Sequence, residues 1–107
     1  MAWIILFIAG LFEVVWASTM KLSEGFTRLT PSIITLVAML ISFGCLAVAM
    51  KQLPLGTAYA IWTGIGAIGA FIVGIIFFND AATLPRIFFV SLIMVGLLGL
   101  KFSTSAT

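Results

Sequence analysis

The sequence has very little charge, a single cysteine and no histidine. Only 7% of its 107 residues are charged, five Lys or Arg and three Asp or Glu, whereas 64% are hydrophobic. An average soluble domain has about 25% charged residues, and so few charges cannot cover a water-facing surface of this size. The composition therefore excludes a soluble globular protein and indicates a membrane protein.

The missing residue types also exclude several kinds of chemistry. The absence of histidine removes the commonest general base and the commonest metal ligand. A single cysteine, Cys45, permits neither an intrachain disulfide nor a cysteine-based metal site. The net charge of +2, without a basic cluster, does not favour nucleic acid as a partner. We therefore expect neither an enzyme nor a metal site, and no cofactor.

Four apolar runs predict four transmembrane helices. A helix needs about 17–25 residues to cross a bilayer. The runs cover residues 3–20, 33–50, 55–78 and 87–100, and the last of them is short. Its flanking cations, Arg86 and Lys101, can reach the membrane interface, so this helix can gain a turn at each end. The prediction is a single all-α transmembrane domain over residues 1–107, with helices at about 3–21, 31–50, 55–78 and 84–103.

The connections between these runs are short and carry helix-boundary signals. Thr30 followed by Pro31 predicts an N-cap and the first position of the second helix. Asn79 and Asp80 predict a turn before the fourth helix. The first apolar run has no basic segment before it and contains Glu13, so we do not expect a cleaved signal peptide.

The positive charges divide almost evenly between the two sides of the membrane. Four helices place Lys51 and Lys101 on the side of the termini, and Lys21, Arg28 and Arg86 on the other side. An excess of Lys and Arg on the cytoplasmic side normally sets the orientation, and an excess of three over two is small. Either one orientation is favoured by a small margin, or the chain inserts both ways.

Glu13 is the acidic residue that lies inside an apolar run. An ionisable group at this depth costs at least about 2.5–3.5 kcal/mol on insertion scales and usually faces a protein interior or an aqueous cavity. Because burial disfavours the charged form of a carboxyl group, Glu13 can hold a proton at one moment and a cation at the next. Ion-coupled transport needs such a group. The alternative is a protonated Glu that only donates a hydrogen bond to a neighbouring helix.

Helical spacing predicts which residues surround this acid. Gly10 and Trp16 lie three residues to either side of Glu13 on the same face, and the Trp16 indole N–H can donate to the carboxylate. Ser42 is the polar residue nearest the middle of the second helix, where it bonds either its own helix or a ligand.

The third helix carries an aromatic and small-residue face. Tyr59, Trp62, Thr63 and Gly66 follow an i, i+3, i+4, i+7 pattern. Trp62 lies too deep for an interfacial belt, so its role is either packing or ligand contact. Gly66 begins a ridge of small residues at i+4 spacing, a common surface for close helix contact.

One chain does not complete a transport site. Many secondary transporters combine two repeats of opposite topology with the site at their interface, and this sequence has no internal repeat. Two copies inserted in opposite directions would supply such a pair, with two Glu13 carboxyls titrating as a coupled unit. We expect Gly96 and Gly99 to be packing positions and the fourth helix to be structural and a candidate dimer contact.

Several segments, in order along essentially the whole chain, resemble the small multidrug resistance family, and in particular its guanidinium-exporter subtype. The matching segments are residues 12–17 (FEVVWA), 25–29 (GFTRL) with Pro31 and Ser32, 54–66 (PLGTAYAIWTGIG) and 99–101 (GLK). Residues 18–25 (STMKLSEG) instead look more like the quaternary-ammonium multidrug branch of the family.

The resemblance implies an antiparallel, dual-topology homodimer in the bacterial inner membrane that exchanges protons for guanidinium cations. The family's central acid corresponds to Glu13, and its central tyrosine to Tyr59. Its supporting hydrogen-bond network maps onto Trp16, Ser42 and Trp62. From the helical faces, we add Gly10, Thr63 and Gly66 as accessory candidates.

These observations predict a proton-coupled antiporter that exports guanidinium and small substituted guanidinium cations. Guanidinium is planar and can offer two parallel N–H groups to one carboxylate, as arginine does. One alternative is a broad-specificity exporter of quaternary ammonium ions, which bind through charge and aromatic faces. Another, from a different class, is a non-transporting helical subunit of a larger membrane complex.

Overall fold

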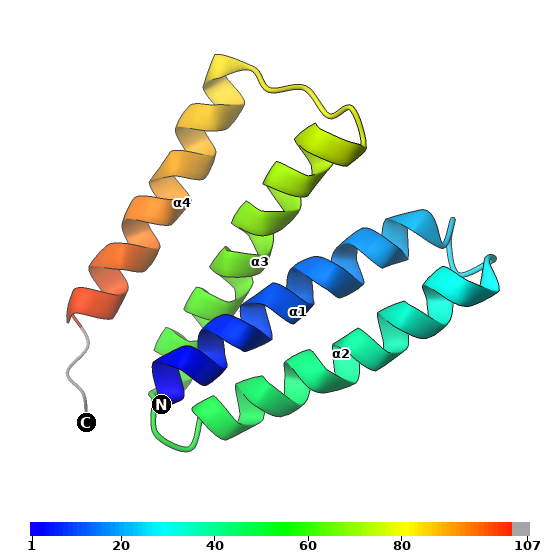
Figure 1. Cartoon of the computed structure of the whole chain (residues 1–107). Helices are drawn as coiled ribbons and strands as arrows, with labels where there is room; N and C mark the ends of the chain where they lie inside the picture. Colours follow the sequence, from blue (N-terminus) through cyan, green and yellow to red (C-terminus); the bar gives the residue numbers. More distant parts are fainter. Residues whose placement is uncertain (104–107) are drawn as a thin grey trace.

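The computed structural model describes residues 1–103, which form four α-helices joined by short connections (Figure 1). The helices are α1 (Ala2–Leu22), α2 (Leu29–Ala49), α3 (Leu55–Phe77) and α4 (Leu84–Ser103). A helix of 20 residues is about 30 Å long, which matches the hydrocarbon thickness of a bilayer. All four helices are long and apolar enough to cross a membrane. The predicted all-α transmembrane architecture is therefore confirmed over the described residues.

Helix α4 is longer than the apolar run that predicted it. It has 20 residues and includes both flanking cations, so it gains a turn at each end as expected. The Arg86 guanidinium donates to the carbonyl oxygen of Ala81 at 2.6 Å and lies 5.2 Å from the centre of the Phe71 ring. The Lys101 ammonium lies 5.4 Å from the centre of the Trp3 ring. Both cations thus lie against aromatic rings at the ends of the helix.

The start of α2 differs from the prediction. The helix begins at Leu29, and its N-cap is Arg28, which is extended (φ −100°, ψ 126°) and makes no side-chain capping bond. The prediction that Thr30 is the cap was therefore wrong. Pro31 lies inside the first turn, where a backbone N–H has no acceptor within the helix, so its missing N–H does not interrupt the hydrogen bonding of the helix.

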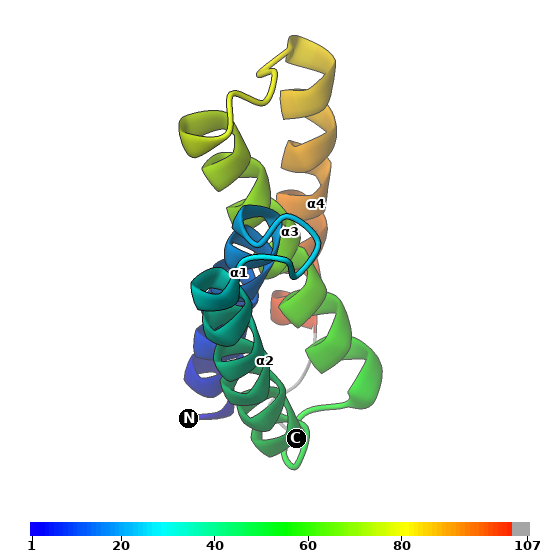
Figure 2. The ribbon, with the colours of Figure 1, turned by 90° about the vertical axis from the view of Figure 1, so that its right-hand side faces the viewer.

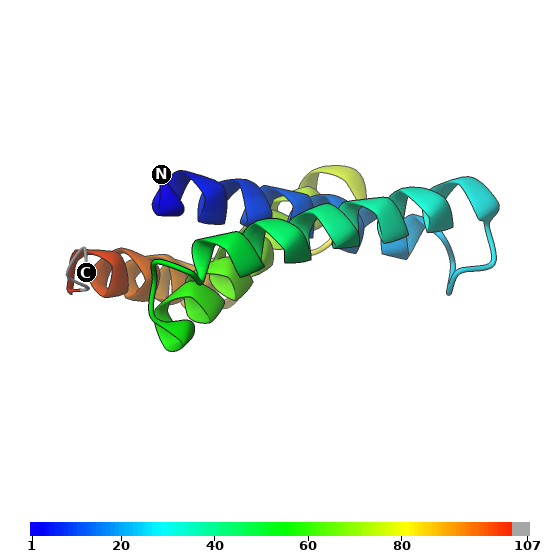
Figure 3. The same ribbon diagram turned by 90° about the horizontal axis from the view of Figure 1, so that it is seen from below.

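The helices form a flat body with extents of 43 × 34 × 17 Å, seen edge-on in Figure 3. Helix α1 packs along α2 and also crosses α3, whereas the backbone of α4 packs against α3 alone among the described helices (Figures 1 and 2). The N-terminus, the α2–α3 connection and the end of α4 lie at one end of the body, and the α1–α2 and α3–α4 connections lie at the other (Figure 1).

Helices α1, α2 and α3 share the core. Its buried members come from all three helices and include Leu6, Ala9, Leu46, Ala49, Ala58, Ile61 and Trp62. A polar contact links α1 to α2 farther along, where the hydroxyl oxygens of Thr19 and Thr35 lie 2.6 Å apart and Thr35 is fully buried. The core therefore combines small and large apolar residues with a polar contact between α1 and α2.

Helix α4 contributes no buried residue to this core. Gly96 and Gly99, which the sequence predicted to be packing positions, face open space, because a Cβ built at either would meet nothing within 4 Å. Gly64 of α3 is different, since a Cβ there would overlap the side chain of Leu97. Within the chain, α4 is thus attached to the core mainly along one side of α3.

Candidate functional site

Glu13 lies in the middle of α1, and its half-buried side chain places the carboxyl group against Gly66 of α3. A Cβ built at Gly66 would overlap this carboxyl, so a larger residue at that position would force the Glu13 side chain to move. The Oε1 atom of Glu13 is buried and has no hydrogen-bond partner among the described residues. Because an unpartnered buried oxygen is energetically costly, this atom marks a position where a proton or a ligand would be stabilising.

Ser42 and Trp62 join the three core helices by two buried hydrogen bonds. The Ser42 hydroxyl donates to the carbonyl oxygen of Ala9 on α1 at 2.7 Å. It accepts the indole N–H of Trp62 on α3 at 2.9 Å. Ser42 therefore bonds across helices and not back to its own helix. It is joined directly to Trp62, which the family resemblance placed in the same hydrogen-bond network.

An aromatic row extends from α1 to α3. Trp16 and Phe43 have ring centres 6.1 Å apart, Phe43 and Trp62 are 5.7 Å apart, and Tyr59 and Trp62 are 5.7 Å apart. Tyr59, at one end of the row, is 55% exposed. Edge-on and tilted ring pairs of this kind leave aromatic faces available, and such faces attract cations.

The Trp16 indole N–H is buried and has no acceptor in the part of the chain that the structure describes. The hydrogen bond from Trp16 to Glu13 that the sequence predicted is therefore not made, although the two residues are one turn apart. The arrangement leaves one buried acceptor and one buried donor unpaired on the same helix.

The three accessory candidates have different positions. Gly66 borders the Glu13 carboxyl, as described above. Gly10 lies beneath Ile65 of α3, where an added Cβ would come within 2.6 Å of the isoleucine side chain. Thr63 is exposed, as is Tyr59 one turn before it, whereas Trp62 and Gly66 are buried. Its role as an accessory residue stays a prediction.

Two components of the site were missed in the sequence. Phe43 lies between Trp16 and Trp62, and the only sequence signal for it was its place next to Ser42. The carbonyl oxygen of Ala9 accepts the Ser42 hydroxyl, and no side-chain pattern reveals such a backbone acceptor. Both depend on how α2 is rotated against α1.

The described residues contain no group of three His, Cys, Asp or Glu side chains that could hold a metal ion. The site instead combines one intramembrane carboxyl, an unpaired indole donor, a fixed hydroxyl–indole pair and several aromatic faces. These groups can bind a proton or an organic cation with N–H donors.

Comparison with known proteins identifies the family. The family model described as "Small Multidrug Resistance protein" matches residues 1–93. The chain is 61% identical over 104 residues to a protein of Yersinia pseudotuberculosis, covering 97% of this chain and 100% of that protein. It is 58% identical over 104 residues to proteins of Proteus vulgaris and Escherichia coli K12, covering 97% of this chain and 100% and 99% of those proteins.

Each of these three relatives is named "Guanidinium exporter". The family match covers most of the chain, and the relatives align over nearly their whole length. Together with four helices that can each span a membrane, these matches show that the chain belongs to the small multidrug resistance family and is a multi-pass protein of the bacterial inner membrane.

Proposed function

We propose that this chain exports guanidinium and small substituted guanidinium cations in exchange for protons. The name shared by its relatives supports the choice of substrate, since identity of about 60% extends over nearly the whole chain. The observation that carries the proposal is the buried Glu13 Oε1 atom, which has no partner among the described residues. A carboxyl group in that position is stabilised either by binding a proton or by pairing with a cation.

Competition for one carboxyl group couples the two fluxes. Guanidinium can place two N–H groups on a carboxylate, but only after the proton has left. A proton and a cation therefore exclude each other at Glu13. If the empty, charged site reorients poorly through the membrane, each reorientation carries one ligand or the other, and the result is exchange.

Ser42 controls the orientation of the acid in this mechanism. A hydroxyl has a single hydrogen to donate, and Ser42 uses it on the Ala9 carbonyl while accepting from Trp62. When Glu13 is charged, the same hydrogen can turn to the carboxylate, with the Trp62 bond holding the Ser42 oxygen in place. The Trp16 N–H, unpaired here, is a second donor for the same carboxylate.

The functional unit in this proposal is an antiparallel homodimer. A single chain supplies one intramembrane carboxyl, and part of its aromatic row is exposed at Tyr59. The nearly even distribution of Lys and Arg permits insertion in both orientations. A second, inverted copy would cover the exposed ring and bring a second Glu13 to the same cavity.

The test measures proton release when a cation binds. Guanidinium added to the purified, reconstituted protein should release protons. Its apparent affinity should fall as the pH falls, approaching about tenfold per pH unit where one proton competes. Glu13→Gln should release none. Guanidinium binding without proton release at any pH would contradict the mechanism.

Export of quaternary ammonium ions is the second candidate. The aromatic row of Trp16, Phe43, Trp62 and Tyr59 favours it, because ions without N–H donors bind through charge and aromatic faces. The same proton-release assay with a tetraalkylammonium ion separates the two candidates. Equal responses to guanidinium and tetraalkylammonium would support the broader substrate range.

A further inference from the structure

A groove outside the Glu13 site runs between α1, α3 and α4. It has a volume of about 330 Å³, and its walls include Phe7 and Leu11 of α1, Ile65 and Gly69 of α3, and Met94 and Leu98 of α4. Among the described residues that line it, Lys101 is the one that carries a charge. The groove occupies the space where the backbones of α1 and α4 do not pack against each other.

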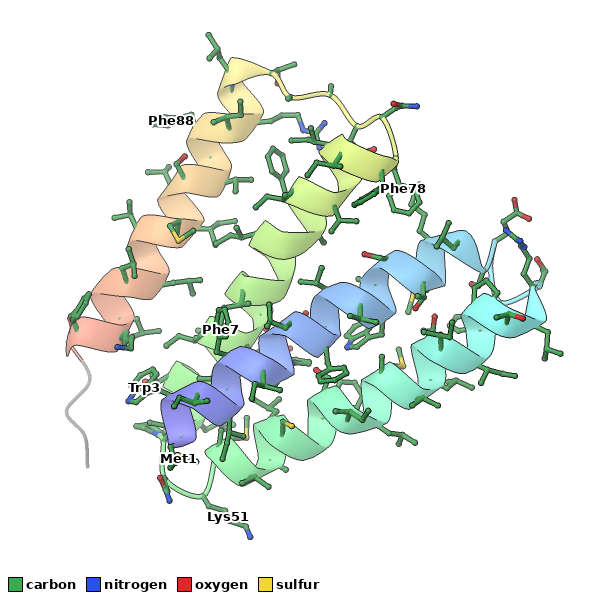
Figure 4. The ribbon with its side chains drawn as sticks, in the orientation of Figure 1. Met1, Trp3, Phe7, Lys51, Phe78 and Phe88 are labelled. Carbon is green, nitrogen blue, oxygen red and sulfur yellow. The ribbon has the colours of Figure 1, made fainter. Side chains whose placement is uncertain are left out.

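The groove extends over about two-thirds of one leaflet of a bilayer. Its lining extends from Phe7 to Val14 on α1 and from Lys101 back to Met94 on α4. Seven residues of helix span about 10 Å, and half of the hydrocarbon core is about 15 Å. The groove thus runs from the membrane interface at Lys101 toward the middle of the membrane. Figure 4 shows Trp3 and Phe7 on the side of α1 that faces α4.

Lys101 is held at the mouth of this groove without an acidic side chain nearby. Its ammonium lies 5.4 Å from the centre of the Trp3 ring and 5.2 Å from that of Phe102. The three acidic residues of the sequence lie elsewhere: Glu13 in the middle of α1, and Glu24 and Asp80 in the connections at the opposite end. The end that contains Lys101 also has Lys51 and the N-terminus, so its charge is positive.

We propose that this groove binds one acyl chain of an anionic phospholipid, and that Lys101 pairs with the phosphate of its headgroup. An apolar groove that runs inward from the interface, with one cation at its interfacial end, is complementary to such a lipid. Trp3 keeps the ammonium at the interface, where aromatic residues are favoured. The bound chain fills the gap between α1 and α4 and so contributes to holding α4 in place.

Lipid retention tests the proposal directly. The full-length protein is purified in detergent and given phosphatidylglycerol and phosphatidylcholine with identical acyl chains. Native mass spectrometry then counts the bound lipids. We expect selective retention of phosphatidylglycerol, at one molecule per chain. Lys101→Gln should lower this retention about five-fold, the effect of removing one cation near an anionic headgroup. Lys51→Gln, which removes the same charge at the same end but outside the groove, should leave it unchanged.

A second pair of variants tests the groove itself. Leu98→Trp fills the groove and should displace the lipid, whereas Leu36→Trp on α2, a site of similar exposure (55% against 49%), should not. Lys101→Gln leaves the apolar walls unchanged, so it tests the proposal even if Leu98→Trp does not fold. Equal retention of both lipids would overturn the proposal, as would equal losses in Lys101→Gln and Lys51→Gln. Loss of dimers with lipid retained in Leu98→Trp would also overturn it, and would assign the groove to a second copy.

Discussion

Helices α1, α2 and α3 form a packed core, whereas α4, which is also apolar enough to span a membrane, contributes no buried residue to it. The difference is clearest at the glycines. An added Cβ at Gly66 of α3 would overlap the Glu13 carboxyl, and one at Gly69 would overlap Val14. An added Cβ at Gly96 or Gly99 of α4 would meet nothing within 4 Å. Hydropathy alone therefore does not distinguish a core helix from a peripheral one.

The physical reason lies in the membrane as a solvent. Lipid tails are as apolar as leucine, so burying an apolar side chain against another helix gains little, and close packing and interhelical hydrogen bonds decide which helices associate. The three core helices have both, in the bonds from Ser42 to Ala9 and from Trp62 to Ser42. In α4, the Ser91 hydroxyl donates to the Ile87 carbonyl of its own helix.

Substitution of Glu13 is expected to have the largest effect on transport. Glu13→Gln should reduce guanidinium-driven proton exchange in proteoliposomes to background, because an amide neither binds nor releases a proton at accessible pH. Helical content, measured by circular dichroism, should be unchanged. Glu24→Gln, which removes an exposed acid from the α1–α2 connection, is the matched control and should exchange as the original protein does. Normal exchange by Glu13→Gln would refute the assignment of the acid.

The next effect tests the close contact of α1 with α3. Gly66→Ala places a methyl group where the Glu13 carboxyl lies, so the carboxyl must move away from its position in the site. We expect a loss of guanidinium affinity of about ten-fold or more by isothermal titration calorimetry. Gly44→Ala on α2 adds the same methyl group in open space and should bind normally. If the two variants bind guanidinium with equal affinity, the Glu13 carboxyl does not lie against Gly66.

A smaller effect on ligand affinity distinguishes Ser42, in the core, from Ser91, in α4. Ser42→Ala removes a bond from each neighbouring helix and leaves the Trp62 N–H unpaired, which should cost about 1–2 kcal/mol. Guanidinium binding should weaken more than tetraalkylammonium binding, because only guanidinium depends on the orientation of the carboxylate. Ser91→Ala should change neither affinity, and equal losses for both ligands in Ser42→Ala would count against the hydrogen-bond network.

The smallest expected effect tests whether α4 contacts a second copy of the chain. Gly96 has room for a side chain within one chain, so Gly96→Val can disturb only contacts with another molecule. If α4 contacts the second copy, dimer dissociation in detergent should increase by about two- to five-fold, because a larger residue keeps the helices apart. The equivalent change on an exposed face of α2, Ala47→Val, provides the baseline. An unchanged dimer would place the contact between copies elsewhere.

Much of the fold could be predicted from the sequence, and the site only in part. The apolar runs predicted four helices, and Arg86 and Lys101 predicted the extra turns of α4. The family resemblance placed Trp62 and Ser42 in one hydrogen-bond network, but the direct bond between them came from the structure. The exposure of Thr63, the place of Phe43 in the aromatic row and the missing bond from Trp16 to Glu13 were not predicted. The first two depend on the rotation of one helix against another, and the third depends on how two side chains are oriented within α1.

The amino-acid sequence by itself determined the number of spans, their approximate ends and the depth of Glu13. Helix length and the transfer of each side chain into lipid are properties of one segment at a time, so they can be summed along the chain. Only the tertiary structure decided that Gly66 faces the Glu13 carboxyl, that the Ala9 carbonyl accepts the Ser42 hydroxyl, and that α4 stays outside the core. These relations arise from close packing between residues distant in the sequence, and no single helix contains the information that sets them.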